Sequence, residues 1–362
     1  LEAKRRGAHV VLVETYATPA ASLADEVVLV RPGTDAYLAL AMDRVLRDEG
    51  KIDRAFLERS TVGWEEFLAS LDRYTAEEAE RITGVTPAQL RSVARGFAAA
   101  KSPVILFGTG MSRHGNGAMA VRCVTTLAAV TGAFSRPFGG IVGNVSSSMA
   151  YDLNLIERPD FGRPGVRSVN MNQLGSALCE LRDPPIMSLY VYSSNPACIA
   201  PNQSAVLRGL EREDLFTVVH ERVMTDTARY ADIVLPADTA MEHADLAASY
   251  GNLCIQKSDA VIAPLGECKS NFDTFALLAR AMGFEEPYFA QSGEALRRAV
   301  LARANPLRDR LSDAEKARFD AGYAVLLPQE DPCAFATKSG KLEFLQPDLE
   351  EPLPRYVSDP CG

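Results

Sequence analysis

Apolar positions along this chain follow two different periods, and the two alternate. Short apolar runs at 8–13, 27–30, 102–107, 189–192, 215–219 and 233–235 predict strands. Apolar residues recur at helical spacing over 36–47, 118–130 and 270–283, and residues 53–100 and 285–332 are also largely helical in pattern. Strands that alternate with helices are typical of an α/β fold with mainly parallel sheets.

One strand-turn-strand pattern occurs twice. In each copy an apolar run ends at an acidic residue, and eleven residues later an Ala-Asp pair precedes the next apolar run. The matched pairs are Glu14 with Glu221, Thr18 with Thr225, Ala21 with Ala228 and Asp25 with Asp232. We therefore expect two related halves, each with an acid at the tip of a strand, as in nucleotide-binding βαβ units.

Two turns in the first half are candidate binding elements. Pro32-Gly33-Thr34-Asp35 leads from a strand into a helix, where Asp35 either binds a ligand or, with Thr34, caps the helix. Gly108 and Gly110 follow a buried strand and precede another helix. A glycine loop at a helix N-terminus can hold phosphate, although a purely structural turn is an equal alternative because no Walker A motif is present.

The stretch 132–149 has no periodicity and is rich in Gly and Ser. Long loops inside a compact domain are functional or disordered, and the apolar residues of this one favour order. Residues 151–173 are expected to connect the two halves.

Composition excludes several classes of protein. The 362 residues are 47% hydrophobic and 23% charged, as in soluble globular proteins, and no run is long enough to span a membrane. A net charge of −9 argues against a nucleic-acid binder. The seven cysteines are isolated, so neither a zinc site nor an iron–sulfur site is predicted. Glu242, His243 and Asp245 lack a further ligand at a suitable spacing, and we expect no metal there.

The sequence starts at Leu1 rather than at a methionine, and LEAKRRG resembles the last turns of a helix that enters a strand. In the second copy a strand and a Ser194-Asn195-Pro196 loop precede the corresponding helix. We therefore expect this chain to be a fragment of a longer protein. No targeting signal can be identified, and the cytoplasm and the periplasm both remain open.

An ordered set of motifs resembles the molybdopterin oxidoreductases, the dimethyl sulfoxide reductase superfamily. The motifs are Ala24-Asp25 through Asp35, Ser194-Asn195-Pro196, Thr225 through Pro236 with Glu242 after it, and Thr337-x-Ser-Gly-Lys341-x-Glu343. The resemblance implies two related Rossmann-like, doubly wound domains with a pseudo-twofold relation, over 1–165 and 166–330, followed by an extended tail over 331–362. Each domain would hold one molybdopterin guanine dinucleotide, with molybdenum or tungsten between them.

The resemblance also implies roles for individual residues. Glu14 and Glu221 would bind ribose or guanine, Asp35 would accept guanine N–H groups, and the two loops would contact pyrophosphate. The full set of implied cofactor-binding residues is Glu14, Thr15, Gly33, Asp35, Gly108, Gly110, Asn144, Ser194, Asn195, Pro196, Glu221, Thr225 and Asp226. No residue of this chain is expected to be catalytic or to ligate the metal.

The chain departs from the family in two respects. The Asp-Pro-Arg that commonly follows the first strand is Glu14-Thr15-Tyr16 here, so that phosphate-binding arginine is missing. Relatives also carry an N-terminal domain with a 4Fe-4S cluster, an upstream metal ligand and a C-terminal β-barrel. We expect these in the parent protein, and we expect the fragment alone to be inactive, with weak or no cofactor binding.

The parent is expected to transfer oxygen atoms or electron pairs to a small-molecule substrate, with an electron-transfer iron–sulfur subunit as partner. Asn195-Pro196-Ala-x-x-Ala-Pro-Asn202 favours the branch of thiosulfate, polysulfide and arsenate reductases. The alternative is a non-catalytic subunit of a respiratory complex that keeps the fold. A thiamine-diphosphate enzyme would need a Gly-Asp-Gly…Asn motif, which the sequence lacks.

Overall fold

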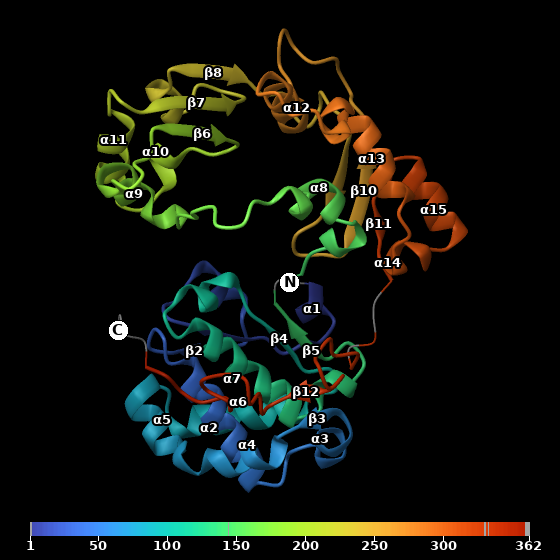
Figure 1. The fold of residues 1–362 in the computed structure, drawn as a ribbon. Coiled ribbons are helices and arrows are strands. Elements are labelled where there is room, and N and C mark those ends of the chain that lie inside the picture. Colours follow the sequence, from blue (N-terminus) through green and yellow to red (C-terminus); the bar gives the residue numbers. More distant parts are fainter. Residues whose placement is uncertain (1, 144, 329–330, 332, 359–362) are drawn as a thin grey trace. The chain divides into compact units, whose positions relative to one another are not determined.

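The computed structural model describes residues 2–143, 145–328, 331 and 333–358, and the chain forms two compact units (Figure 1). The first unit comprises Leu1–Val145 together with Gln329–Gly362, and the second comprises Ser146–Pro328. The second unit is therefore inserted into the first. These units divide the chain after Val145, whereas the sequence-based ranges 1–165, 166–330 and 331–362 describe cofactor-binding domains and stay predictions.

The first unit is mainly helical, with three small parallel sheets. Its helices are α1 (Glu2–Arg5), α2 (Asp35–Asp48), α3 (Arg54–Ser60), α4 (Trp64–Ser70), α5 (Ala76–Thr83), α6 (Pro87–Ala99) and α7 (Gly117–Val130). Its strands are β1 (Val11–Glu14), β2 (Glu26–Leu29), β3 (Thr61–Val62), β4 (Val104–Leu106), β5 (Gly140–Val142) and β12 (Leu342–Glu343). The parallel pairs are β1 with β2, β4 with β5, and β3 with β12.

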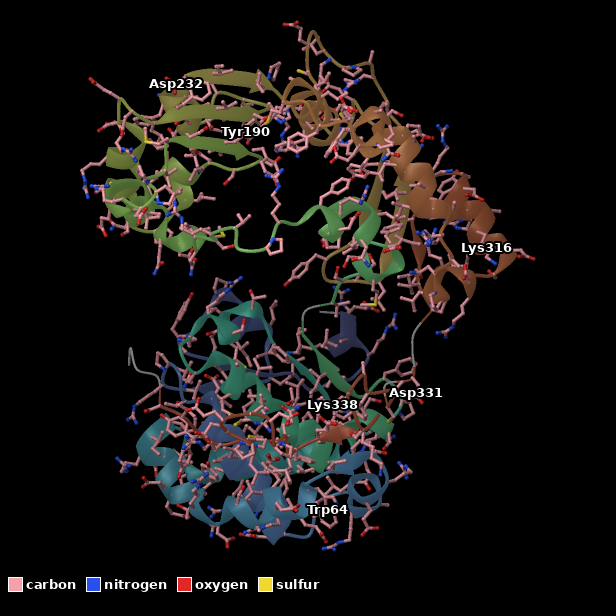
Figure 2. The ribbon with its side chains drawn as sticks, viewed as in Figure 1. Trp64, Tyr190, Asp232, Lys316, Asp331 and Lys338 are labelled. Atoms are coloured by element: carbon pink, nitrogen blue, oxygen red, sulfur yellow. The ribbon has the colours of Figure 1, made fainter. Side chains whose placement is uncertain are left out.

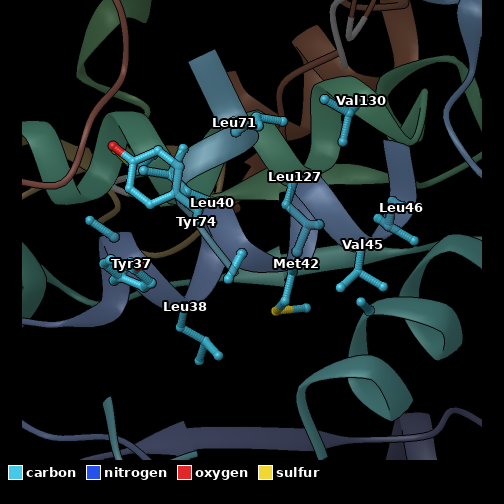
Figure 3. Packing of buried hydrophobic residues seen from close by; sticks show 14 of the residues in the cluster. Tyr37, Leu38, Leu40, Met42, Val45, Leu46, Leu71, Tyr74, Leu127 and Val130 are labelled. Atoms are coloured by element: carbon cyan, nitrogen blue, oxygen red, sulfur yellow. The ribbon is translucent and has the colours of Figure 1, made fainter. Parts of the chain in front are cut away.

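Helix α2 is the centre of the first unit's core. Residues from Ala36 to Met42 are buried on every face, because α5, α6 and α7 all pack around this helix (Figure 3). A helix that is apolar all round belongs inside a protein. Tyr37 meets the ring of Tyr74 edge to face at 5.1 Å, which extends the core toward the loop that follows α4.

The segment after residue 332 completes this core. Phe344 is 1% exposed and its ring stacks on that of Phe67 at 4.6 Å. Arg122 of α7 donates to the carbonyls of Phe344 and Glu351 at 2.8 and 2.7 Å, which fixes the returning chain. Two segments far apart in sequence therefore share one hydrophobic core.

The second unit contains a three-stranded parallel sheet and a separate antiparallel sheet. Its strands are β6 (Ser188–Tyr192), β7 (Phe216–Glu221), β8 (Ile233–Pro236), β9 (Asp245–Ala248), β10 (Cys254–Ser258) and β11 (Val325–Leu326). Its helices are α8 (Asn154–Glu157), α9 (Leu174–Glu180), α10 (Pro196–Ile199), α11 (Gln203–Leu210), α12 (Asn271–Ala281), α13 (Gly293–Ala302), α14 (Pro306–Asp309) and α15 (Asp313–Asp320). The sheet orders are β6-β7-β8 and β11-β10-β9.

The α/β class is confirmed, and the structure adds strands that the pattern did not predict. Strand β5 lies in the stretch that has no periodicity, since glycines flank its two apolar residues. The hairpin of β9 and β10 lies in a part of the chain for which no strand was predicted. The N-caps at Thr75, Thr86 and Ser270 each accept a backbone N–H three residues on. Thr34 does not cap α2, because its hydroxyl donates to the Arg31 carbonyl instead.

Candidate nucleotide-binding sites

Strands β1 and β2 are joined by a short 3-10 turn, η1 (Pro19–Leu23), and by bonds to one aspartate. Asp25 accepts the N–H of Val10 at 2.8 Å, and its own N–H donates to the Val10 carbonyl at 2.8 Å. Lys4 forms an ion pair with Asp25 at 2.9 Å. The hydrogen bond from Val10, and then the Lys4 ammonium, lower the pKa of Asp25, so the carboxylate stays charged.

The same bonds recur in the second unit. Asp232 lies 207 positions after Asp25, accepts the N–H of Thr217 at 2.7 Å and donates its N–H to the Thr217 carbonyl at 2.9 Å. Strand pairing keeps this offset, because Val11 pairs with Glu26 and Val218 pairs with Ile233. Asp232 is labelled at this sheet in Figure 2. The repeat predicted from matched residues is therefore present in the local structure.

Each repeat ends its first strand at a glutamate with the same local geometry. Oε1 of Glu14 accepts the N–H of Thr15 at 2.8 Å, and Oε1 of Glu221 accepts the N–H of Arg222 at 2.8 Å. No hydrogen bond joins either Oε2 to a described residue. Each strand tip therefore presents one carboxylate oxygen, which is the acceptor that a ribose diol requires.

The first residue of α2 completes an acidic cluster in the first unit. Asp35 is partly buried, and this burial is the main cause that raises the pKa of its carboxyl; nearby Glu14 raises it further and His114 lowers it. The strand tip, the start of α2 and the loop before α7 therefore meet near Asp35. Gly33 allows the turn, since its φ of +74° is left-handed.

Asn116 supports this cluster from the start of α7. Its Nδ2 donates to the carbonyls of Gly33 and Val357 at 2.9 and 2.7 Å. The side chain is buried, and its Oδ1 has no partner among the described residues. A buried acceptor without a donor is unfavourable, so a bound polar group would stabilise this position.

The glycine loop lies on the carboxyl side of β4. A Cβ built on Gly108 or Gly110 meets no atom within 4 Å, and neither residue has a positive φ. By contrast, a Cβ on Gly117 at the start of α7 would lie 2.8 Å from the Met111 carbonyl oxygen. The chain itself therefore requires glycine at 117 but not at 108 or 110, where a ligand close to the backbone would explain it.

In the second unit, Asn195 connects the loop after β6 to the turn after β7. Its Oδ1 accepts both the N–H and the hydroxyl of Thr227 at 3.1 and 2.8 Å, and its Nδ2 donates to Asp226 at 3.2 Å. The Thr227 oxygen in turn accepts the N–H of Ala197 at 3.0 Å. Thr225 accepts the N–H of Ala228 at 3.2 Å. These bonds fix both loops at the same edge of the sheet.

Two cavities open beside these loops. One of about 240 Å³ is lined by Tyr190, Tyr192, Ser194 and Pro196, at the carboxyl end of β6. Another of about 340 Å³ is lined by Asp226, Arg229, Cys198 and Gln203. Ligands of open α/β sheets bind at the carboxyl ends of the strands, so both cavities lie where the fold favours binding.

The structure thus brings most predicted residues together within their own unit. Glu14, Thr15, Gly33 and Asp35 gather at one sheet edge, and Ser194, Asn195, Pro196, Glu221, Thr225 and Asp226 gather at another. Asn144 lies outside the described residues, and its role stays a prediction. The cofactor-binding roles of all these residues also stay predictions.

Sequence reasoning missed Asn116, and it assigned neither Thr227 nor His114 to the binding site. Asn116 stands in a Gly-Asn-Gly run that the sequence shows only as part of a glycine-rich loop. Its importance comes from the returning segment at Val357, which is 241 residues away. Of these three residues, Thr227 carried a signal through its place in the motif Thr225–Pro236, although the corresponding position in the first repeat is Ala20.

The side chains of the segment after β8 contact one another and the neighbouring backbone. His243 lies 3.0 Å from Asp238 and 3.6 Å from Asp245. Glu242 accepts the N–H groups of Leu265 and Thr239 at 2.7 and 2.8 Å, so both of its oxygens already hold loops in place. Among described residues, no group of three His, Cys, Asp or Glu is placed to hold a metal ion.

The fold is that of an α/β protein with a repeated strand-turn-strand unit, and comparison with known proteins shows its family. A family model described as molybdopterin oxidoreductase matches residues 1–281. The chain belongs to the molybdopterin oxidoreductase family.

Individual relatives agree. The chain is 38% identical over 365 residues to the protein named Probable oxidoreductase YoaE of Bacillus subtilis, covering 98% of this chain and 53% of that protein. It is 28% identical to dimethyl sulfoxide reductase DmsA of Escherichia coli, covering 98% and 52%. It also matches the structure of acetylene hydratase from Pelobacter acetylenicus with a TM-score of 0.74 and 24% identity, covering 98% and 54%, which shows the fold.

The chain thus spans about half the length of the relatives that it matches. Within its described residues, no helix combines the length and the apolar character that crossing a bilayer would need.

Proposed function

We propose that this chain supplies two guanine dinucleotide-binding regions of a molybdenum or tungsten oxidoreductase. The observation that carries the proposal is the repeat at an offset of 207, which ends both times in a glutamate with one free carboxylate oxygen. A cofactor with two similar dinucleotides needs two similar binding regions, and one repeated strand unit for each would meet that need. In this proposal the two regions form Rossmann-like domains related by a pseudo-twofold axis.

The residues of the first region suit a nucleotide. Glu14 would accept ribose hydroxyls through Oε2, and Asp35 at the start of α2 would accept the N–H groups of guanine. Gly108 and Gly110 leave room for pyrophosphate against the backbone, where N–H groups can donate to it. Arg113, which is exposed, would supply a positive charge in place of the arginine of the family's Asp-Pro-Arg.

The second region offers a matching set. Glu221 takes the place of Glu14, and the bonded loops of Asn195 and Thr227 hold the approach to the strand ends. Ser194 and Pro196 would lie against the second pyrophosphate, with Thr225 and Asp226 near the second nucleotide. Both regions bind and orient, and neither contributes a group that reacts.

When bound, the cofactor would supply oxygen-atom or electron-pair transfer at its metal. The substrate would be a small molecule, and the wording of the Asn195–Asn202 loop favours a sulfur- or arsenic-containing oxyanion or polysulfide. The metal ligand, a 4Fe-4S cluster and an electron-transfer partner subunit would belong to the rest of the parent protein. The chain alone would bind the cofactor weakly and show no turnover.

The test is metal and pterin analysis of the full-length parent purified without oxygen. We expect about one molybdenum or tungsten atom and two pterin guanine dinucleotides per chain, following the two repeats. A folded parent that contains neither group would contradict the proposal, and it would favour a non-catalytic subunit of a respiratory complex instead.

A further inference from the structure

Residues 351–357 cross the first unit as an irregular segment, here called the latch, that belongs to no helix or strand. Arg122 of α7 holds the start of the latch, because it donates to the carbonyls of Glu351 and Pro352 at 2.7 and 2.5 Å. Backbone outside helices and sheets can open locally without breaking a regular element. The position of the latch therefore depends on a few side-chain contacts.

The end of the latch lies against the first turn of α2. The N–H of Tyr356 donates to the Tyr74 hydroxyl at 3.0 Å, and the Tyr356 ring meets the ring of Tyr37 edge to face at 5.4 Å. Tyr37 is 5% exposed and lies two residues after Asp35, the first residue of α2. Tyr37 and Tyr74 are both labelled in the core of the first unit (Figure 3). The latch thus packs on the helix turn that carries Asp35.

Asn116 joins the latch to the turn before α2 through one amide group. Its Nδ2 carries two hydrogens and donates to the carbonyls of Gly33 and Val357 at 2.9 and 2.7 Å. The side chain is only 5% exposed, so water has little access to replace either bond. A buried donor that loses its acceptor is unfavourable, and departure of the Val357 carbonyl therefore favours a new position for Asn116 and releases Gly33. Both carbonyls depend on this one side chain.

We propose that the latch and the turn at residues 33–35 open and close together, with Asn116 as the positioning residue between them. Opening removes the bond that fixes Gly33, whose φ of +74° lies in a region that only glycine leaves and enters freely. Coupling between two sites is reciprocal, so a ligand that binds the closed turn also keeps the latch closed. The consequence for guanine nucleotides rests on the proposed function, whereas the coupling itself does not.

The test measures hydrogen exchange in the ligand-free chain. The amide of Thr34 reports on the turn, because it donates to a carbonyl of the same turn at 3.2 Å, and the amide of Tyr356 reports on the latch. Arg122→Met removes the guanidinium bonds that hold the latch, and none of these bonds reaches residues 33–35. We expect exchange at both amides to rise by about tenfold or more, while the amide of Leu40 inside α2 keeps its rate.

Arg136→Met is the matched control. Arg136 also belongs to the first unit and also donates to three backbone carbonyls, but none of these bonds reaches the latch or residues 33–35. Both reporter amides should therefore keep their rates in this variant. Asn116→Asp places a carboxylate opposite the two carbonyls that the amide now bridges, and it should accelerate both reporters. If Arg122→Met fails to fold, Arg122→Lys, which keeps the charge, replaces it.

Guanosine diphosphate, added in excess, tests the reciprocal effect. Exchange at the Tyr356 amide should slow on binding, and the affinity for the nucleotide should fall in Arg122→Met but not in Arg136→Met. Absence of nucleotide binding would contradict the proposed function alone, because ligand-free exchange decides the coupling. Faster exchange at Tyr356 with an unchanged rate at Thr34 in Arg122→Met would overturn the proposal. Equal acceleration in Arg136→Met would also overturn it, since that result would show a general loss of stability.

Discussion

The residues proposed to contact nucleotide belong to strand-turn-strand units that are held together by their own hydrogen bonds. Glu14 and Glu221 each accept the N–H of the next residue, and Asp25 and Asp232 each bridge to the neighbouring strand. Because one oxygen of each glutamate is already engaged, the other has a defined direction before any ligand arrives. Preorganisation of this kind lowers the entropic cost of binding.

Substitution of the two glutamates should change how many dinucleotides the holoprotein retains. Glu14→Gln and Glu221→Gln each remove the charge of one ribose acceptor, which costs about 1.5–3 kcal/mol, or roughly 10–100-fold in affinity. We expect each full-length variant to keep one dinucleotide and lose much of the other, as measured by nucleotide analysis after gel filtration. The exposed Glu211→Gln serves as control. Two dinucleotides retained in both variants would contradict the assignment.

The glycine loop gives a prediction in which stability and binding separate. A Cβ at position 108 or 110 meets no atom within 4 Å. In Gly108→Ala and Gly110→Ala the free energy of unfolding should therefore stay unchanged or rise by about 0.4–1 kcal/mol. Cofactor content should fall, because the methyl group occupies space proposed for pyrophosphate. Gly117→Ala should do the opposite and destabilise by about 1–3 kcal/mol, since its Cβ would lie 2.8 Å from the Met111 carbonyl oxygen. Unfolding curves and pterin analysis of the three variants check both effects.

Local signals made several of these residues predictable from sequence. The repeated acid and Ala-Asp pair indicated that Glu14 and Asp25 match Glu221 and Asp232, because the bonds of these residues lie within one strand-turn-strand unit of each copy. Asn116 was not predictable, since its burial depends on Val357 at the far end of the chain.

At the scale of elements, the contact between α2 and α7 contains a buried acid. Asp43 is 0% exposed, its Oδ2 lies 2.5 Å from the Thr126 hydroxyl, and its Oδ1 has no described partner. Thr126 also donates to the Cys123 carbonyl at 2.6 Å. A hydroxyl has only one proton to donate, so a protonated Asp43 that donates to Thr126 satisfies both bonds. Burial raises the pKa of Asp43 well above its ordinary value, in agreement with a neutral carboxyl.

This acid should make stability fall as pH rises. Since the folded pKa is raised, the folded state holds a proton that the unfolded state has released, and the free energy of unfolding falls from about pH 4 up to the raised pKa, by at most ~1.4 kcal/mol per pH unit. Asp43→Asn keeps the shape without titrating and should lose this part of the decline. Urea unfolding at pH 5 and pH 8 measures the difference, with the exposed Asp48→Asn as control. An unchanged slope in Asp43→Asn would show that Asp43 is not the source.

Helices and strands could be predicted from the sequence where the apolar pattern extends over enough residues to be detected. Helices α2, α7 and α12 begin and end within one or two residues of the predicted ranges, because each presents apolar residues over three or more turns. Strand β5 has three residues, one of them glycine, and it is a strand only because it pairs with β4. Strands β9 and β10 likewise depend on each other rather than on an apolar pattern.

At the scale of the whole chain, the two units have separate cores. One buried cluster contains Leu40, Leu90 and Phe344 of the first unit, and another contains Leu178 and Val206 of the second. Separate cores should unfold separately.

We therefore predict two calorimetric transitions with independent responses. Leu40→Ala should lower the unfolding temperature of the first unit only, and Leu178→Ala that of the second unit only. Each substitution should reduce the free energy of unfolding of its unit by about 2–5 kcal/mol, because both side chains are fully buried. Differential scanning calorimetry of the two variants assigns the transitions. A single transition that both substitutions shift equally would show that the chain unfolds as one body.

The insertion of one unit into the other also has a consequence for synthesis. The surface of Phe67 that Phe344 covers is made early, whereas Phe344 follows only after the whole of Ser146–Pro328. At 5–20 residues per second, roughly 180 intervening residues take about 10–40 s to translate. During this time the nascent first unit exposes the face of Phe67 that Phe344 covers in the finished chain.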